Sequence, residues 1–113
     1  MKKISFFLLF FLALTALPAY AHPPSDIQLT FDQESKALQA VIMHDVKNPA
    51  KHFIFKVDVS LNGEEIISHT ISRQDNTVSQ TVLYVIPDAK PGDALSVEAY
   101  CSIAGKLEKE LKI

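Results

Sequence analysis

The sequence predicts an all-β protein, namely an immunoglobulin-like antiparallel β-sandwich of about seven strands. After residue 21, no segment shows the 3.6-residue apolar period of an α-helix. Several segments instead show the two-residue alternation of a half-buried strand, and turn-forming residues separate them at near-regular spacing. A chain of 113 residues is long enough for one small domain of this class and too short for two.

The clearest pair of strands lies in the middle of the chain. In residues 53–61 every odd position is apolar, and the even positions after Ile54 are polar, as expected for a strand with one buried face. Asn62-Gly63 follows, and both residues tolerate the positive φ angles of a type I′ hairpin turn. Residues 65–71 are the expected returning strand, so the sequence predicts a β-hairpin here.

Five further strands are expected around this hairpin. They are residues 27–31 and 37–43 on its N-terminal side and residues 77–86, 95–103 and 107–113 on its C-terminal side. Strand alternation places Cys101 on the same face as Leu95 and Val97, toward the core or a pocket at its end. The segments between the strands contain the glycine, proline and polar residues that favour turns.

The first 21 residues differ in character from the rest. Lys2 and Lys3 precede an apolar run over residues 4–17, and Pro18-Ala19-Tyr20-Ala21 supplies the small residues that a signal peptidase recognises. The apolar run is shorter than the roughly 20 residues that span a bilayer. We therefore expect residues 1–21 to be a cleaved signal peptide. Residues 22–113 would then form an exported domain, periplasmic or secreted, with no membrane span.

The charge of the chain argues against one class of partner. The formal net charge is −2, and loss of Lys2 and Lys3 would leave nine basic residues against 13 acidic ones, a net charge of −4. A mildly acidic domain without a basic stripe is a poor candidate for binding nucleic acid. Nor does the sequence contain paired catalytic carboxylates, a nucleophile elbow or a phosphate-binding loop. The oligomeric state is not indicated.

One cysteine and three histidines form the most informative set of residues. Cys101 is the only cysteine, so in an exported chain it cannot form an intramolecular disulfide. A thiolate together with the imidazoles of His22, His44 and His52 suits iron, copper or zinc. His44 and His52 lie at the two ends of a loop in which Asn48-Pro49 favours a turn, so their rings can converge. The alternative is an inert buried cysteine with ordinary polar histidines.

Three short motifs surround these residues. A histidine begins the strand His52-Phe53-Ile54-Phe55-Lys56-Val57-Asp58-Val59, a cysteine and a glycine bracket Cys101-Ser102-Ile103-Ala104-Gly105, and a histidine precedes prolines in His22-Pro23-Pro24. In these motifs the chain resembles the iron-binding domain of desulfoferrodoxins and superoxide reductases. That family has a His-Tyr-Ile strand start, a Cys-Asn-x-His-Gly segment and an early histidine followed by proline. The resemblance extends over most of residues 22–113 and also implies an immunoglobulin-like sandwich.

The resemblance implies a metal centre and an activity. It implies that His22, His44 and His52 are equatorial ligands of a ferrous iron (Fe2+) and that Cys101 is the axial thiolate ligand. Residues 22–113 would then be a desulfoferrodoxin-like iron-binding domain, which reduces superoxide by one electron to hydrogen peroxide. Superoxide and an electron-donor protein are the partners that this activity requires.

The chain also departs from the family pattern. Ala104 stands where the family has its fourth ligand histidine, and Asp45 replaces the proline after the first histidine of the loop. No lysine precedes His22, and no Cys-x-x-Cys pair exists for a second iron centre. His69 would replace the missing ligand only if its hairpin folds toward the site, and its place on a strand favours a structural role. The sequence is therefore compatible with an active site and with a degenerate one.

Two other functions are compatible with the same residues. The first is a copper-binding module, because nitrogen and sulfur ligands generally bind copper more tightly than iron. Cleavage after Ala21 would give His22 a free amino group that chelates copper together with its imidazole. The second is a non-enzymatic carrier or binding subunit of an exported redox or sulfur-handling complex, since an immunoglobulin-like fold does not by itself imply catalysis.

Overall fold

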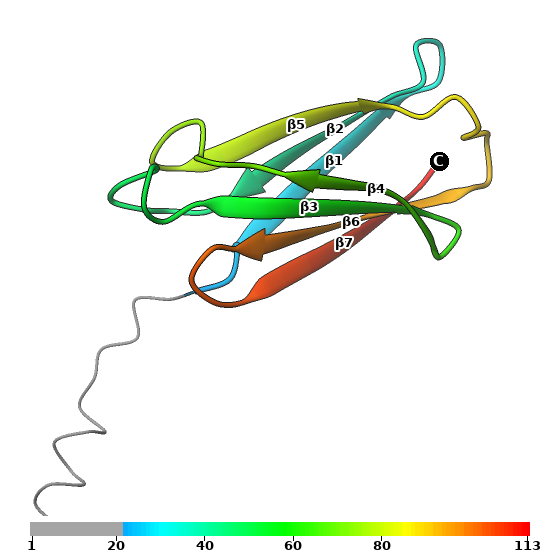
Figure 1. The fold of residues 1–113 in the computed structure, drawn as a ribbon. Coiled ribbons are helices and arrows are strands. Elements are labelled where there is room, and N and C mark those ends of the chain that lie inside the picture. The colour runs from blue at the N-terminus through cyan, green and yellow to red at the C-terminus, as the bar shows by residue number, and fades with distance from the viewer. Residues whose placement is uncertain (1–21) are drawn as a thin grey trace, which may run out of the picture.

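The structure, a computed structural model, describes residues 22–113, which form two antiparallel sheets that pack as a sandwich (Figure 1). The three-stranded sheet has the order β1-β2-β5, with β1 (Asp26–Asp32), β2 (Ala37–Met43) and β5 (Ser79–Val85). The four-stranded sheet has the order β4-β3-β6-β7, with β3 (Ile54–Leu61), β4 (Glu64–Thr70), β6 (Ala94–Cys101) and β7 (Lys106–Lys112). The predicted all-β sandwich of about seven strands is thus confirmed. The expected signal peptide lies outside the described residues, among which there is no helix that could cross a membrane.

The core lies between the two sheets and consists mainly of aliphatic side chains. Its members are Ile27, Leu38, Ala40, Ile42, Ile54, Val57, Val59, Val82, Ile86, Ala89, Leu95, Val97 and Ala99. Burial of each larger side chain in this set contributes about 1.5–3 kcal/mol. In β6 the buried residues alternate with partly exposed ones up to Cys101, which is 4% exposed. The predicted inward orientation of Cys101 is therefore confirmed.

The predicted hairpin connects β3 and β4. Asn62 and Gly63 have φ angles of 51° and 86°, and Leu61 pairs with Glu64 across the two-residue turn. Positive φ at both central residues is the requirement of a type I′ turn. The side chain of Asn62 also accepts a hydrogen bond from the backbone N–H of Ala94 at 2.9 Å, which ties the turn to the start of β6.

Two strands differ from the predicted bounds by two residues at one end, and both differences have a local cause. β5 begins at Ser79 rather than residue 77, because the side-chain oxygen of Asn76 accepts hydrogen bonds from the backbone N–H groups of Val78 and Ser79 and holds a turn there. β6 ends at Cys101 rather than residue 103, because the Cys101 N–H donates to the carbonyl of Gly105 at 2.9 Å. The turn that follows keeps Cys101 at the end of the sheet.

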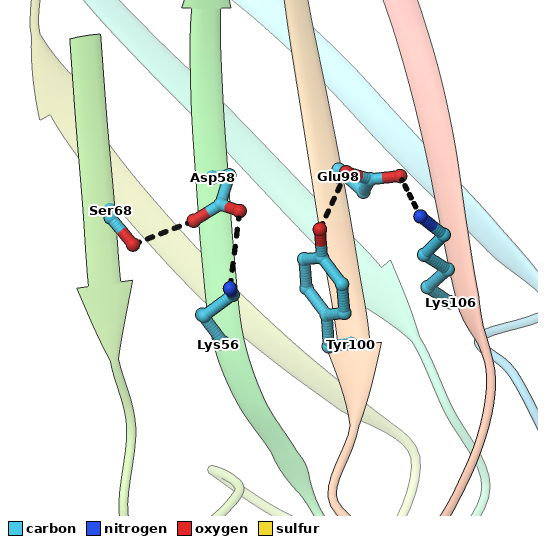
Figure 2. Close-up of polar contacts among 6 residues, drawn as sticks. All are labelled: Lys56, Asp58, Ser68, Glu98, Tyr100 and Lys106. Carbon is cyan, nitrogen blue, oxygen red and sulfur yellow. Dashed lines mark hydrogen bonds and ion pairs between the residues drawn. The ribbon is translucent and has the colours of Figure 1, made fainter. Parts of the chain in front are cut away.

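The outer face of the four-stranded sheet carries a polar network of Lys56, Asp58, Ser68, Glu98, Tyr100 and Lys106 (Figure 2). Asp58 and Glu98 lie directly opposite each other on β3 and β6, an arrangement that by itself is unfavourable for two carboxylates. Each has its own cation, since Lys56 lies 3.5 Å from Asp58 and Lys106 lies 3.2 Å from Glu98. The network faces away from the core.

One end of the sandwich gathers four segments that are distant in the sequence (Figure 1). They are the N-terminal segment before β1, the β2–β3 loop, the β4–β5 loop and the β6–β7 turn. Two backbone hydrogen bonds connect three of these segments. The Gln74 N–H in the β4–β5 loop donates to the carbonyl of Pro49, and the Ser102 N–H in the β6–β7 turn donates to the carbonyl of Phe53, both in the β2–β3 loop. The three histidines and the cysteine singled out in the sequence all lie in or next to these segments.

Candidate metal centre

His44 is the most buried of the three histidines, with 1% of its surface exposed. It comes directly after β2, and its backbone N–H donates to the carbonyl of Val78 at 2.9 Å. Its ring nitrogen Nδ1 lies 2.9 Å from the side-chain oxygen of Gln74, and its Nε2 lies 3.2 Å from the carbonyl oxygen of His22. The imidazole is therefore held on both sides by polar groups of other segments.

His52 reaches the same place from the far end of the β2–β3 loop. The carbonyl of Asn48 accepts hydrogen bonds from the N–H groups of Lys51 and His52, at 3.0 and 2.9 Å. This turn reverses the chain just before β3, so that the His52 and His44 rings lie with their centroids 4.9 Å apart. The two histidines at the loop ends do converge, as the Asn48-Pro49 turn predicted.

His22 is placed by the proline that follows it. Pro23 lies against Gly105 in the β6–β7 turn, where a Cβ added to the glycine would be only 2.9 Å from the Pro23 nitrogen. This close approach brings the N-terminal segment beside the other candidate ligands. The His22 ring centroid lies 4.8 Å from that of His44 and 5.0 Å from that of His52.

The three imidazoles have the separations that a metal site needs. Their ligand atoms all lie within 4.8 Å of one another. Three such atoms share a point at most about 2.8 Å from each, compared with about 2.0–2.1 Å for a zinc–imidazole bond. Small rotations of the rings that move each nitrogen by less than about 1 Å would bring all three within bonding distance of one metal ion. The donor set therefore fits a transition-metal ion.

Cys101 adjoins this cluster through His52. Its sulfur lies 3.2 Å from Nε2 of His52 and accepts the backbone N–H of Ile103 at 3.4 Å. The thiolate is the form of cysteine that binds metals. The cysteine is buried and is a free thiol, so it is available as a fourth ligand.

Burial also changes the pKa of one imidazole in the cluster. Desolvation lowers the pKa of His52, and the neighbouring His44 and His22 rings lower this pKa further. A histidine whose pKa is lowered is neutral at physiological pH, and only the neutral imidazole has a lone pair for a metal. At His52 the electrostatics therefore favour metal binding over protonation.

No family model and no curated protein matches this chain. Among solved structures, a superoxide reductase of the one-iron type from Giardia intestinalis superposes with a TM-score of 0.60. The two sequences are 14% identical, and the superposition covers 81% of this chain and all of the other. The fold resembles that of a superoxide reductase. At this identity the likeness concerns the fold alone.

The remaining histidine lies elsewhere in this superoxide-reductase-like fold. Nδ1 of His69 on β4 lies 2.7 Å from the hydroxyl of Tyr84 on β5, so it joins the edges of the two sheets. Ala104, at the position where the resemblance leads one to expect a fourth histidine, is exposed in the β6–β7 turn. The described residues thus bring His22, His44 and His52 together, with Cys101 next to His52 and without a fourth imidazole.

Gln74 is the site residue that the sequence did not reveal. It is 1% exposed and contacts Nδ1 of His44, yet it lies in the polar run Ser72-Arg73-Gln74-Asp75-Asn76. Nothing in that run distinguishes it from its solvent-exposed neighbours. Its burial arises only when the β4–β5 loop folds over the β2–β3 loop.

Proposed function

We propose that this protein is an exported metal-binding domain of superoxide-reductase type, in which His22, His44, His52 and Cys101 bind one ferrous iron. The observation that carries the proposal is the convergence of three imidazoles within 4.8 Å of one another, with the Cys101 sulfur 3.2 Å from one of them. The superoxide-reductase-like fold is consistent with the same proposal.

Bound iron would supply the one-electron reduction of superoxide to hydrogen peroxide. The chain's own residues prepare the site for it. Cys101, supported by the Ile103 N–H, would donate electron density to the ion through its thiolate. His52, with its lowered pKa, would stay neutral, and the buried ring of His44 would be oriented by the contact of its Nδ1 with Gln74.

Copper is the second candidate metal. It is favoured by the absence of an imidazole at Ala104, because three imidazoles and one thiolate resemble copper sites at least as much as five-ligand iron sites. In that case cleavage after Ala21 would matter, since a free amino group on His22 would add a ligand. Intact mass of the exported protein would show whether the chain begins at His22.

Metal analysis and spectroscopy of protein purified after expression of the full chain test the proposal. Protein loaded anaerobically with Fe2+ and then oxidised should bind one iron and show a thiolate-to-iron charge-transfer band. The band should vanish in Cys101→Ala and persist in His69→Ala, a histidine outside the cluster. Protein that binds no metal would contradict the proposal, whereas preferential binding of copper in direct competition would support the second candidate.

Catalysis requires its own measurement. Iron-loaded wild-type protein should consume superoxide with formation of hydrogen peroxide. It should not release the molecular oxygen that dismutation of superoxide would produce. His69→Ala should retain the activity, and Cys101→Ala should lose it. Iron binding without superoxide consumption would indicate a degenerate site that stores or carries the metal.

A further inference from the structure

The side chain of Gln74 uses all of its hydrogen-bonding capacity. Its nitrogen Nε2 donates to the carbonyl oxygens of His44, at 2.7 Å, and Asn76, at 3.0 Å. Its oxygen Oε1 accepts the backbone N–H of Ile54 at 3.2 Å and lies 2.9 Å from Nδ1 of His44. One buried amide thus connects the β2–β3 loop, the start of β3 and the β4–β5 loop.

These partners determine which way the amide points. The carbonyl oxygens of His44 and Asn76 can only accept, so the amide nitrogen must face them. The backbone N–H of Ile54 can only donate, so the amide oxygen must face it. A flipped amide would make three wrong contacts at once, which excludes the usual ambiguity of a glutamine side chain.

The orientation of Gln74 in turn determines the tautomer of His44. Because Oε1 is an acceptor, the ring nitrogen that faces it at 2.9 Å must carry the proton. That nitrogen is Nδ1, and the lone pair of the neutral ring is therefore on Nε2. We propose that Gln74 is a positioning residue of the metal centre, which fixes His44 in the Nδ1–H form and presents its Nε2 to the metal. This inference rests on the proposed metal-binding function.

The carbonyl oxygen next to Nε2 shows what Gln74 has to work against. Nε2 of His44 lies 3.2 Å from the carbonyl oxygen of His22. In the Nδ1–H form both atoms carry lone pairs and no proton lies between them, so their contact is repulsive. A cation bound at Nε2 would either displace this carbonyl oxygen or be bound by it as well, and in both cases the repulsion would end. Without Gln74 the opposite tautomer would be favoured, since an Nε2–H could donate to the His22 carbonyl and would then be unavailable to a metal.

Groups that hydrogen-bond to a metal-binding histidine have a known effect. A hydrogen bond to the distal nitrogen of a metal-binding histidine sets its tautomer and orientation, and its removal typically costs about 10–100-fold in metal affinity. Gln74 performs this task with a neutral amide, and the amide itself is held by two carbonyls and one N–H of the backbone. The Gln74 amide therefore does not have to reorient when a metal binds to His44.

The first test uses wild-type protein without metal. Protein expressed from the full chain with 15N-labelled histidine, and treated with a chelator, should show His44 in the Nδ1–H tautomer by long-range 15N–1H NMR. Free histidine favours the Nε2–H tautomer, so the two outcomes are distinct. The His44 signals are assigned from their absence in His44→Ala. An Nε2–H tautomer at His44 would overturn the role assigned to Gln74, whatever the protein does with metals.

The second test compares two buried glutamines. Gln74→Met should weaken Co2+ binding, followed by its absorption bands, about 10–100-fold and shift His44 toward the Nε2–H tautomer. Gln80→Met is the matched control, since Gln80 is also buried but its side chain contacts only Asp75 and Thr81. It should leave both the tautomer and the Co2+ affinity unchanged, even if it lowers stability as much.

The outcomes separate this inference from the proposed function. If wild-type protein shows the Nδ1–H tautomer but binds no Co2+, the metal-binding function fails while the assignment of the His44 tautomer stands. If wild-type protein binds Co2+ and Gln74→Met binds it equally well, the function stands and the positioning role of Gln74 fails. If Gln74→Met does not fold, the tautomer of the wild-type protein still decides the question.

Discussion

The ring nitrogen Nε2 of His52 lies 3.2 Å from the sulfur of Cys101, although 49 residues separate them in the chain. The pairing of β3 with β6 brings them together, because Ile54 pairs with Cys101 at the end of these strands. His52 lies just before β3 and Cys101 is the last residue of β6. A core strand pair thus sets the position of half of the candidate metal centre.

Removal of His52 should therefore abolish stabilisation by metal. At 100 times its dissociation constant, a ligand that binds only the folded state raises the free energy of unfolding by about 2.7 kcal/mol. For a domain of this size that is a rise in Tm of about 10–20 °C. Calorimetry with Co2+ should show this rise in the wild type and in His69→Ala, and little of it in His52→Ala. An equal rise in all three proteins would place the metal elsewhere.

Gly105 should be needed for the position of His22 as well as for the turn. Its φ is +93°, and an added Cβ would lie 2.9 Å from the nitrogen of Pro23. Gly105→Ala should thus displace the N-terminal segment and weaken Co2+ binding, in addition to a backbone cost of at least about 1 kcal/mol. Isothermal titration with Co2+ and chemical unfolding measure the two effects separately.

Gly63→Ala is the matched control for this substitution. Gly63 also has a positive φ, +86°, but its added Cβ would have no atom within 4 Å. Gly63→Ala should lower the free energy of unfolding by about as much as the backbone cost of Gly105→Ala, without any change in metal affinity. If Gly63→Ala and Gly105→Ala weakened Co2+ binding equally, the contact between Gly105 and Pro23 would have no specific part in the site.

Local patterns predicted much of the fold because strands and tight turns depend on neighbouring residues. The alternation in residues 95–103 was sufficient to orient Cys101, and Asn62-Gly63 was sufficient for the hairpin. The convergence of His44 and His52 followed from the loop between them. The role of Gln74 could not be predicted, because it depends on contacts with residues 20 and 30 positions away. The early end of β6 likewise depends on a turn bond from Cys101 to Gly105.

Two lysine–carboxylate pairs should differ in their contribution to stability. Lys109 lies 2.7 Å from Asp26, but both side chains are about half exposed, and such pairs contribute at most about 1 kcal/mol. Lys56 lies 3.5 Å from Asp58, whose side chain is 10% exposed, so removal of the cation leaves a carboxylate with poor access to water. Lys56→Met should cost about 1–2 kcal/mol, as measured by urea unfolding.

Lys109→Met provides the comparison for Lys56→Met. It should change the free energy of unfolding by no more than about 0.5 kcal/mol, and salt should reduce even that difference. The tyrosine ring of Tyr100, 4.5 Å from the Lys56 ammonium, adds to the cost of losing Lys56. Equal effects of the two substitutions would show that Asp58 remains hydrated despite its burial.

The partly buried hydroxyl of Tyr84, which lies 2.7 Å from Nδ1 of His69, should make the stability of the fold depend on pH in the alkaline range. Burial, together with the negative charge of Asp58, raises the pKa of Tyr84 to about 12. In the unfolded chain a tyrosine loses its proton near pH 10. Between about pH 10 and pH 12 the unfolded state therefore binds fewer protons than the folded state, so the free energy of unfolding falls as the pH rises. Below pH 10 both states are protonated and this contribution is complete.

Tyr84→Phe should reduce that fall. The pKa of Tyr100 is also raised, first of all by its hydrogen bond to Glu98, so part of the pH dependence should persist in Tyr84→Phe and disappear in the double variant with Tyr100→Phe. Urea unfolding at intervals from pH 9 to pH 12 measures the slope. A slope unchanged in Tyr84→Phe would mean that the hydroxyl is as hydrated in the folded protein as in the unfolded chain. In that case the contact with His69 across the open edge of the sandwich would not hold the two sheets together.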